Sequence, residues 1–600
     1  MTKIFTVIFI LFGAGSLLFA QNYNWITPNQ TYLKMYVVKD GIHRIDKTDF
    51  TSAGITVSTI DPRTVKVYYK GNQVPIYFFG ESDGTFDDAD YFDFYGMRNA
   101  GGVTNVFSET GTVVYTTDEY YNLYSDTSAF WVGWGGANGL RFTDYSNSST
   151  TPYSFDYYYS KLHFETDLIY SLGQNINPDT DFNNFLNDKY KGEGWYWMLM
   201  QNNNQLSQSF TDYLLSNSTQ QCRLKLFSFP VKQNTAVTNE HRIVVKVNTT
   251  QFDTLRFDDF NRLDTTLYFS GSALVPGANS ASIRYLPSDA AMQTNFDFFE
   301  ITYAKRFEFD SSYIGFSSEL TSTAPAIFFV KGASASNPVS IYDIKNGNRV
   351  TNYTISNDTL YFVGMSNGQF EVNNKQITRK PPRIKQRQVP SLVSNSAGAD
   401  YIVVYNKLFE TQAEQLRSFR NTHDGFRSFK AEIEDIYDVF NYGMDNPAAV
   451  RNFTKNAFDN WAQPKFKYLC LFGRGSLDPK KLQSSSVYYR NLVPVYGNPA
   501  TDGYFANFNI GSQLYNHHVG VGRLPAYTVT EAQDMVNKIM SYESLGLPEW
   551  IKTSLFVTGG KNYSEQQVFI AQTNYFINSY IATPPLSSNP VKIYLGDSTG

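Results

Sequence analysis

The pattern of the chain changes abruptly between Lys375 and Gly398, and this change limits the possible folds more than any other feature. Before it, short runs of alternating apolar and polar residues are separated by turn residues, which predicts antiparallel β structure. After it, apolar strand-like runs alternate with segments of helical periodicity, which predicts a mainly parallel sheet with helices on both faces. The stretch itself contains six basic residues and three prolines, so we predict a surface linker there.

Several domains are expected, because 600 residues exceed what one hydrophobic core can organise. In the β-rich part, the runs Tyr32–Val38 and Ile42–Ile45 flank a Lys-Asp-Gly turn and are predicted to form a hairpin. We divide the chain into a signal peptide, a β-rich domain, a β-sandwich-like domain, a small β domain, the basic Pro-rich linker and an αβα domain, at residues 1–20, 21–220, 221–325, 326–374, 375–398 and 399–600 respectively.

The first residues of the chain have the parts of a secretory signal peptide. Lys3 supplies a positive charge, Ile4–Phe19 is an apolar run, and Ala20 is a small residue at the expected cleavage site. An uncleaved membrane anchor is the alternative, but the run contains polar and glycine residues and is short for a bilayer span of about 20 residues. We therefore expect an exported protein.

Charge and cysteine content argue against two other classes of protein. A formal net charge of -5 and a pI near 5.8 provide no basic field for a phosphate backbone, so no nucleic-acid partner is expected. Only Cys222 and Cys470 are present, which excludes a disulfide framework. Cys470 lies in the middle of the apolar run Tyr468–Phe472, and Cys222 has no histidine near it in the sequence, so both thiols are predicted to be structural.

The region after the linker has the order of an α/β domain. Apolar strand-like runs are predicted at Tyr401–Tyr405, Phe429–Ile436, Tyr468–Phe472, Val519–Leu524, Leu555–Thr558 and Val591–Leu595. Helices are predicted between them at Glu410–Arg420, Ala448–Trp461, Thr530–Glu543 and Glu565–Ile581. Functional sites of such sheets lie at the carboxyl ends of the strands.

An aspartate-rich loop is the one candidate metal site in the sequence. Asp83, Asp87 and Asp90 have spacings that could surround a hard cation such as Ca²⁺, and Gly84 permits a sharp turn. A solvated hairpin turn is the alternative, because the loop lacks the distal glutamate of an EF-hand. No cofactor is otherwise required.

Several segments resemble the gingipain-type cysteine peptidase family, and in particular its members attached to the type IX secretion system. The segments after the linker are Asp400–Val404, Ala431–Asp438 with Phe440–Gly443, Tyr468–Asp478, Thr501–Phe505 and Val519–Pro525. In the β-rich part, Asp40–Ile45, Asp61–Val67 and Asp83–Asp90 resemble the region that precedes the peptidase domain in the secretion-associated members.

The resemblance implies a caspase-like αβα domain with a cysteine nucleophile and a histidine base at the ends of two consecutive strands. The histidine must lie within hydrogen-bond reach of the thiol, so that a thiolate attacks the peptide carbonyl. In the family the histidine follows a strand within Gly-His-Gly, and this chain shows no counterpart. We therefore expect both catalytic groups beyond Gly600, an incomplete αβα domain at residues 399–600, and no activity from this chain alone.

Five residues are candidates for the substrate side of the site, because they lie on loops after strands or near them. They are Arg474, Asp478, Asp502, His518 and Arg523. His518 aligns where the family usually has an acidic residue that helps orient the catalytic histidine, and Arg474 aligns where the family usually has an aspartate.

Our leading hypothesis is an exported cysteine endopeptidase precursor that acts on polypeptides, with the β-rich region as prodomain or scaffold. One alternative is the sortase of the type IX secretion system, which removes sorting signals from cargo and has the outer-membrane secretion machinery as partner. Another is a non-catalytic surface or adhesion protein that keeps the peptidase fold as a scaffold. The expected location is the cell surface, the outer membrane or the medium. The basic linker is either a processing site or a plain spacer.

Overall fold

The structure is a computed structural model, and the predicted signal peptide lies outside the residues that it describes. No helix in the described part of the chain is long and apolar enough to cross a bilayer. The chain divides into two compact units, Met1–Tyr527 and Thr528–Gly600. The description covers residues 23–595 except 102, 108–112, 118–119, 149–152, 155–156, 171–194, 213–219, 310–312, 319, 376–378, 484–489, 497–499, 509–516 and 547.

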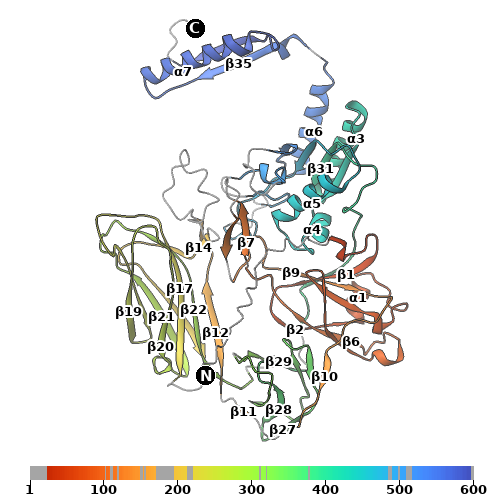
Figure 1. Cartoon of the computed structure of the whole chain (residues 1–600), viewed down its shortest axis with the longest axis vertical. Helices are drawn as coiled ribbons and strands as arrows, with labels where there is room; N and C mark the ends of the chain where they lie inside the picture. Colours follow the sequence, from red (N-terminus) through yellow and green to blue (C-terminus); the bar gives the residue numbers. More distant parts are fainter. Residues whose placement is uncertain are drawn as a thin grey trace, which may run out of the picture. The chain divides into compact units, whose positions relative to one another are not determined.

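The first β-rich body consists of two facing sheets with a common apolar core (Figure 1). One sheet has the order β30-β1-β9-β3-β4 and the other β2-β6-β5. The strands are β1 (Thr31–Val37), β2 (Gly41–Asp46), β3 (Lys66–Tyr69), β4 (Asn72–Val74), β5 (Ile76–Phe79), β6 (Tyr91–Gly96), β9 (Ser128–Gly133) and β30 (Arg383–Gln388), and α1 (Lys47–Ser52) follows β2.

The predicted hairpin between Tyr32–Val38 and Ile42–Ile45 is wrong. Strand β1 pairs with β30 and β9, whereas β2 pairs with β6 in the other sheet. A turn does follow β1, but it leads the chain into the other sheet instead of back along β1. The pairing is decided by partners that are far away in the sequence.

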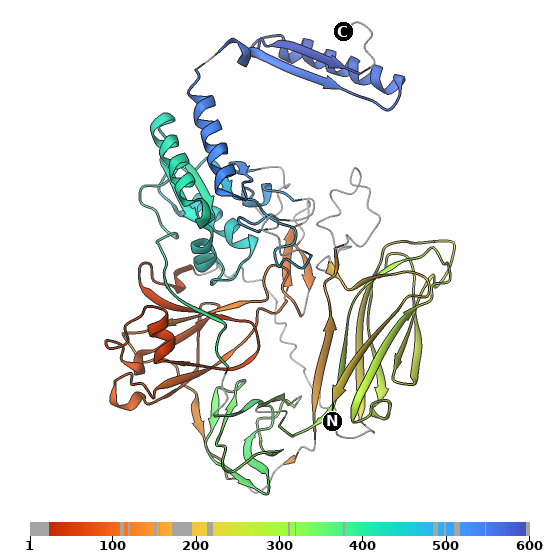
Figure 2. The same ribbon diagram turned by 180° about the vertical axis from the view of Figure 1, so that it is seen from behind.

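A larger β-sandwich follows, with one sheet ordered β12-β22-β17-β20 and the other β16-β21-β18-β19 (Figure 2). Its strands are β12 (Tyr157–Glu165), β15 (Met198–Met200, paired with β22), β16 (Gln205–Asp212), β17 (Gln221–Pro230), β18 (His241–Val247), β19 (Thr250–Phe257), β20 (Leu263–Ser270), β21 (Gly277–Tyr285) and β22 (Thr294–Arg306). The predicted boundary between 21–220 and 221–325 is therefore misplaced. β12 pairs with β22 along nine residues, so the sandwich begins before residue 221.

The third β body contains the small domain predicted at 326–374 together with earlier strands. Its sheets have the orders β10-β26-β25-β29-β23 and β11-β24-β28-β27 around a separate core. The strands are β10 (Thr143–Tyr145), β11 (Tyr153–Ser154), β23 (Tyr313–Ser317), β24 (Pro325–Lys331), β25 (Val339–Asp343), β26 (Asn348–Val350), β27 (Tyr353–Ser356), β28 (Thr359–Met365) and β29 (Gln369–Asn374).

The predicted parallel sheet is present after residue 398, with the order β32-β31-β33-β34 and every pairing parallel. Its elements are β31 (Tyr401–Tyr405), α3 (Glu410–His423), β32 (Ser428–Glu432), α4 (Ile433–Phe440), α5 (Pro447–Asn460), β33 (Tyr468–Phe472) and β34 (Gly520–Leu524). The strand predicted at Phe429–Ile436 is too long, because Ile433 already begins α4. Ile433, Ile436, Tyr437 and Phe440 have the spacing of one helix face, which is the signal that the strand prediction overlooked.

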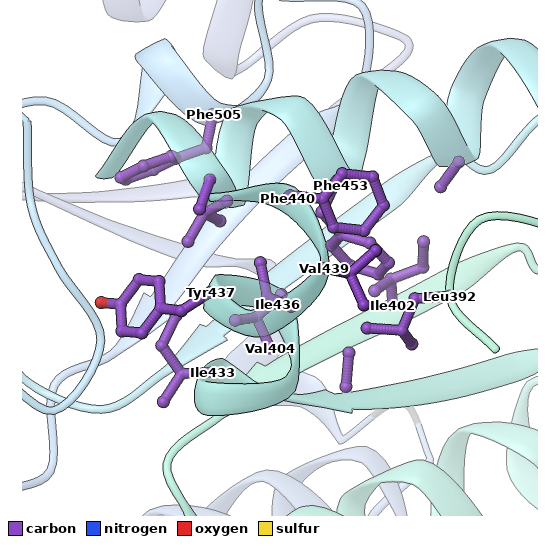
Figure 3. Close-up of a cluster of buried hydrophobic side chains, with 14 of the residues drawn as sticks. Leu392, Ile402, Val404, Ile433, Ile436, Tyr437, Val439, Phe440, Phe453 and Phe505 are labelled. Atoms are coloured by element: carbon purple, nitrogen blue, oxygen red, sulfur yellow. The ribbon is translucent and has the colours of Figure 1, made fainter. Parts of the chain in front are cut away.

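Helices cover both faces of this sheet. On one face, α4 and α5 pack against Ile402, Val404 and Leu471 in one apolar cluster (Figure 3). On the other face, α3 buries Leu416, and Phe409 just before it stacks on Phe472 with ring centroids 5.5 Å apart. The region is therefore a three-layered αβα arrangement.

The second unit contains α6 (Val529–Glu543), β35 (Thr553–Thr558), α7 (Tyr563–Phe576) and β36 (Asn589–Tyr594). Strands β35 and β36 pair in parallel, and Phe556 faces Phe576 of α7 at 6.5 Å between ring centroids. The predicted alternation of helix and strand is thus present here as well.

The basic stretch at 375–398 differs from the expected spacer. Part of it is strand β30, which adds to the edge of the first sheet beside β1. An edge position leaves one side of the strand unpaired, which is compatible with the prolines on either side. Arg387 of this strand donates to Asp438 (2.6 Å) and Asp435 (2.7 Å) of α4. Arg387 is therefore a partner of an acidic helix.

A buried ion pair joins the first β body to the parallel-sheet region. Lys34 of β1 is 1% exposed, and its Nζ lies 2.5 Å from Oδ1 of the fully buried Asp438. Burial alone would lower the pKa of Lys34, but Asp438, Tyr36 and Glu434 raise it to about 12. The lysine is therefore charged, and it requires the acidic side chains of α4 beside it.

The chain also makes a close backbone approach beside this ion pair. Gly443 has φ 91°, and a Cβ there would lie 2.9 Å from Cε of Lys34 and 3.0 Å from the Trp131 ring. The indole of Trp131 donates to the carbonyl of Tyr442 (2.9 Å), and that of Trp25 donates to Val439 (3.1 Å). Only glycine combines this conformation with this contact.

We predict that Lys34→Met lowers the free energy of unfolding by about 3–5 kcal/mol, because it leaves Asp438 buried with one partner fewer. Urea unfolding measures the change. Lys385→Met is the matched control, since this lysine pairs with Glu434 where both side chains are 30% exposed, and its loss should cost about 1 kcal/mol or less. Equal costs for the two variants would contradict the assignment.

Candidate functional site

The carboxyl edge of the parallel sheet brings three of the predicted site residues together. Arg523 lies near the end of β34, Arg474 follows β33, and Asp502 lies in the loop that leads toward β34. The Arg523 guanidinium forms a two-pronged pair with Asp502, with Nη2 to Oδ1 at 2.7 Å and Nε to Oδ2 at 2.9 Å. This edge is where an α/β fold places its chemistry.

The remaining donors of Arg523 fix loop backbone rather than point to an open site. Nη1 donates to the carbonyls of Gly473 (2.7 Å) and Val493 (2.9 Å), and Nη2 donates to Pro494 (2.8 Å). The side chain is 11% exposed. Arg523 and Asp502 therefore position the loops at the strand ends, and the predicted direct contact with substrate stays a prediction.

Asp478 and Arg474 also organise this loop. Both oxygens of Asp478 accept backbone amides, from Leu482 (2.8 Å) and Gln483 (2.9 Å), and the residue is 6% exposed. The Arg474 backbone donates to Ala526 and accepts from Leu492, both at 2.9 Å. The loop that follows β33 is thus tied to the segments on either side of it.

His518 lies apart from these residues. It precedes the start of β34, so it belongs to the amino edge of the sheet, whereas Arg523 belongs to the carboxyl edge. Its Nδ1 accepts the amide of Phe508 (3.3 Å), and its ring lies 5.8 Å from that of Phe458. The structure does not bring His518 to the other candidates.

Neither cysteine has the surroundings of a nucleophile. Cys470 lies at the centre of β33, beside Val403 of β31, and is 6% exposed, and Cys222 on β17 is 1% exposed. Burial raises the pKa of each thiol to about 11, so little thiolate exists near neutral pH. The predicted structural roles agree with this burial.

The aspartate-rich loop has bonding partners within the protein. Asp90 accepts the amide of Asp87 (2.8 Å), Asp83 accepts that of Thr85 (2.9 Å), and Asp88 pairs with Lys47 (2.7 Å). These are the bonds of a tight turn. Calcium binding at Asp83, Asp87 and Asp90 stays a prediction.

The sequence-based reasoning missed Lys480. This lysine lies within the turn capped by Asp478, its side chain is 7% exposed, and its Nζ lies 3.4 Å from Asp126 and 3.6 Å from Asp167. No spacing in the sequence connects these residues, because the acidic partners come from the distant β-rich part. The loop after β33 therefore has a charged contact with that part.

Comparison with known proteins places this site in a family. Residues 394–599 match the model of peptidase family C25. The chain thus carries a region of the gingipain family of cysteine peptidases, as the motifs after the linker had indicated. No curated protein matches the chain.

The fold is similar to that of a particular member of the type IX secretion system, the dimeric latent PorU of Porphyromonas gingivalis, seen in a crystal structure. The TM-score is 0.61 with 16% identity, and the match covers 91% of this chain and 54% of that chain. The chain therefore spans about half the length of PorU. A CBM36 domain of a xylanase from the hindgut metagenome of Trinervitermes trinervoides matches 17% of this chain and 74% of its own, with 11% identity and a TM-score of 0.14.

We predict that neither thiol of the folded protein reacts with iodoacetamide at about pH 7.5, because burial and the raised pKa keep both protonated and covered. Mass spectrometry after timed alkylation measures the modification. The same thiols react in urea, which is the control for reagent quality. Rapid alkylation of Cys470 in the folded protein would contradict its assigned place in the sheet.

We predict that Arg523→Lys destabilises the loops at the carboxyl edge by about 1.5–3 kcal/mol, because lysine cannot reproduce the planar fork and the carbonyl contacts. Hydrogen exchange at the amides of Leu492 and Phe505 should accelerate, since both are hydrogen-bonded within these loops. Arg417→Lys is the control, because its pair with Glu414 lies on the surface of α3 and should change stability by less than about 0.5 kcal/mol. If hydrogen exchange at these amides were unchanged in Arg523→Lys, the inference that Arg523 positions the loops would be wrong.

Proposed function

We propose that this chain is part of an exported, gingipain-type cysteine endopeptidase precursor that cleaves polypeptides. The observation that carries the proposal is the C25 match over residues 394–599, on a parallel sheet at whose carboxyl edge Arg523 binds Asp502 and three loop carbonyls. Cys222 and Cys470 are too deeply buried to serve. The proposal therefore locates the catalytic histidine and cysteine, which the resemblance implies, beyond residue 600.

Within this proposal, the β-rich region acts as a scaffold. Its Trp131 and Tyr32 belong to the same apolar cluster as Ile436 and Phe453 of the C25 region, and Lys34 pairs with Asp438 across the same contact. Removal of a prodomain here would expose this apolar cluster and leave the acidic face of α4 without its cations. Such a contact supports retention of the β-rich region.

A second candidate is a sortase that removes C-terminal sorting signals from cargo of the type IX secretion system, with the outer-membrane machinery as partner. The similarity of fold to PorU favours it, because the match includes the β-rich region as well as the C25 region. Export, at the cell surface or into the medium, is part of both proposals.

An assay of the full-length protein tests both candidates. It is incubated with a cargo protein that carries a C-terminal sorting domain and, separately, with an unfolded polypeptide that has none, and the products are mapped by mass spectrometry. Cleavage of both substrates supports the general endopeptidase, and cleavage only before the sorting domain supports the sortase. Failure to cleave either would contradict the proposed peptidase and support a non-catalytic scaffold.

The two buried cysteines provide the control variants. We predict that Cys222→Ser and Cys470→Ser each retain the cleavage activity within about twofold, because neither thiol is the nucleophile. Circular dichroism shows that each variant is folded. A loss of about a hundredfold or more in a folded Cys470→Ser protein would place the nucleophile in β33 and overturn the proposed location of the catalytic pair.

A further inference from the structure

A hollow of about 650 Å³ lies at the amino edge of the parallel sheet, whereas the loops around Arg523 lie at the carboxyl edge. Its lining comes from the end of α5, from the residues that lead into β33 and from those that lead into β34. Pockets that hold a ligand have volumes of roughly 300–1,000 Å³. The hollow is therefore large enough to bind a group from outside the chain.

Positive charge dominates the lining. The exposed Lys465 and Lys467 belong to it, and no aspartate or glutamate is among the described residues that line it. Nζ of Lys465 lies 4.0 Å from the ring centroid of Phe458. The pKa of Asp400 is lowered mainly by Arg427, which binds both oxygens of that carboxylate (2.9 and 3.0 Å), and only to a smaller extent by Lys467. The two lysines therefore give the hollow a net positive charge.

Two aromatic rings form walls of the hollow. Phe458 lies 5.8 Å from His518 between ring centroids, and Tyr468 stacks on Phe426 at 5.5 Å while it remains 44% exposed. Gly520 is opposite Tyr468 in the register of β33 and β34. A Cβ at this glycine would lie 3.2 Å from Cδ1 of the tyrosine, so a larger residue would crowd the ring. The hollow thus offers apolar faces next to its charges.

The lysines and His518 provide hydrogen-bond donors. An ammonium group donates and does not accept. Nδ1 of His518 accepts the amide of Phe508 (3.3 Å), so the ring hydrogen lies on Nε2. A complementary ligand therefore has negatively charged oxygen acceptors together with an apolar part.

We propose that this hollow binds an acidic peptide segment, which places carboxylates at Lys465 and Lys467 and an apolar side chain against Phe458 and Tyr468. Carboxylates match the charge and the donors, and the aromatic walls suit an apolar side chain, which an inorganic anion lacks. A nucleic acid fits less well, because a chain with a net charge of -5 repels an extended polyanion. The proposal does not rest on the proposed function, since neither the catalytic groups nor Arg523 take part in it.

Fluorescence anisotropy with the full chain tests the proposal. The probe is the fluorescein-labelled peptide Gly-Glu-Phe-Asp-Glu-Gly, and the reference peptide has glutamine and asparagine in place of the acidic residues. We expect saturable binding of the acidic peptide that salt weakens, and a loss of about three- to fivefold in each of Lys465→Gln and Lys467→Gln. Lys455→Gln is the matched control, because this exposed lysine of α5 pairs with Asp459 outside the hollow. Equal binding of the reference peptide, or an equal loss in the control, would overturn the proposal.

A second measurement separates a peptide site from a patch that attracts any anion. Tyr468→Ala keeps both lysines but removes one aromatic wall, so the acidic peptide should bind about fivefold more weakly. Neither inorganic phosphate nor phosphatidylserine vesicles should displace the peptide at an equal concentration of charge. If either competitor displaces it, or if Tyr468→Ala that is folded by circular dichroism binds it unchanged, the proposal fails. Neither measurement requires cleavage of a peptide, so failure here leaves the proposed function standing.

Discussion

The pairing of Lys34 with Asp438 is the constraint on which the arrangement of the larger unit depends. A lysine with 1% exposure is tolerated only where an acidic partner meets it, and that partner comes from a helix about 400 residues later in the chain. Strand β1 must therefore lie against α4. This position explains why β1 is buried on both faces: one face packs against the core of its own body, and the other packs against the C25 region.

The basic stretch before the parallel sheet is explained by the same contact. Arg387 of β30 donates to Oδ2 of Asp438 and Lys34 donates to Oδ1, so one buried carboxylate has a cation at each oxygen. Glu434 adds a further acidic group, and although burial alone would raise its pKa, Lys34 and Lys385 lower it to about 2. A stretch with this function cannot remain a free spacer. The segment that connects the β-rich part to the parallel sheet is thus also part of the contact between them.

The sequence predicted the parallel sheet better than the β-rich part for a physical reason. Tyr401–Tyr405 and Tyr468–Phe472 are continuous apolar runs, and both were located within the observed bounds because buried parallel strands have no polar face. In the antiparallel part, local alternation identifies strands but not their partners. The hairpin expected at Lys39–Gly41 failed on this point, as did the boundary at residue 221, since β12 is completed by β22.

The candidate site was predictable only in part. The edge that carries Arg474, Asp502 and Arg523 follows from the strand order, but the use of Arg523 to hold three loop carbonyls depends on backbone positions that no spacing encodes. His518 lies at the opposite edge because a strand of five residues separates it from the carboxyl end. Lys480 and Asp167 had no signal at all, since their contact joins separate domains.

The position of Cys470 connects this sheet to the chemistry of its family. A parallel sheet covered on both faces buries the centres of its strands and leaves only the strand ends open to a substrate. Cys470 is opposite Val403 in the middle of the sheet, and burial raises its pKa to about 11. A nucleophilic thiol needs the opposite surroundings, with access and a nearby base that lowers its pKa. The surroundings of Cys470 are therefore not those of a nucleophile, and under the proposed function the reacting thiol belongs to a strand end.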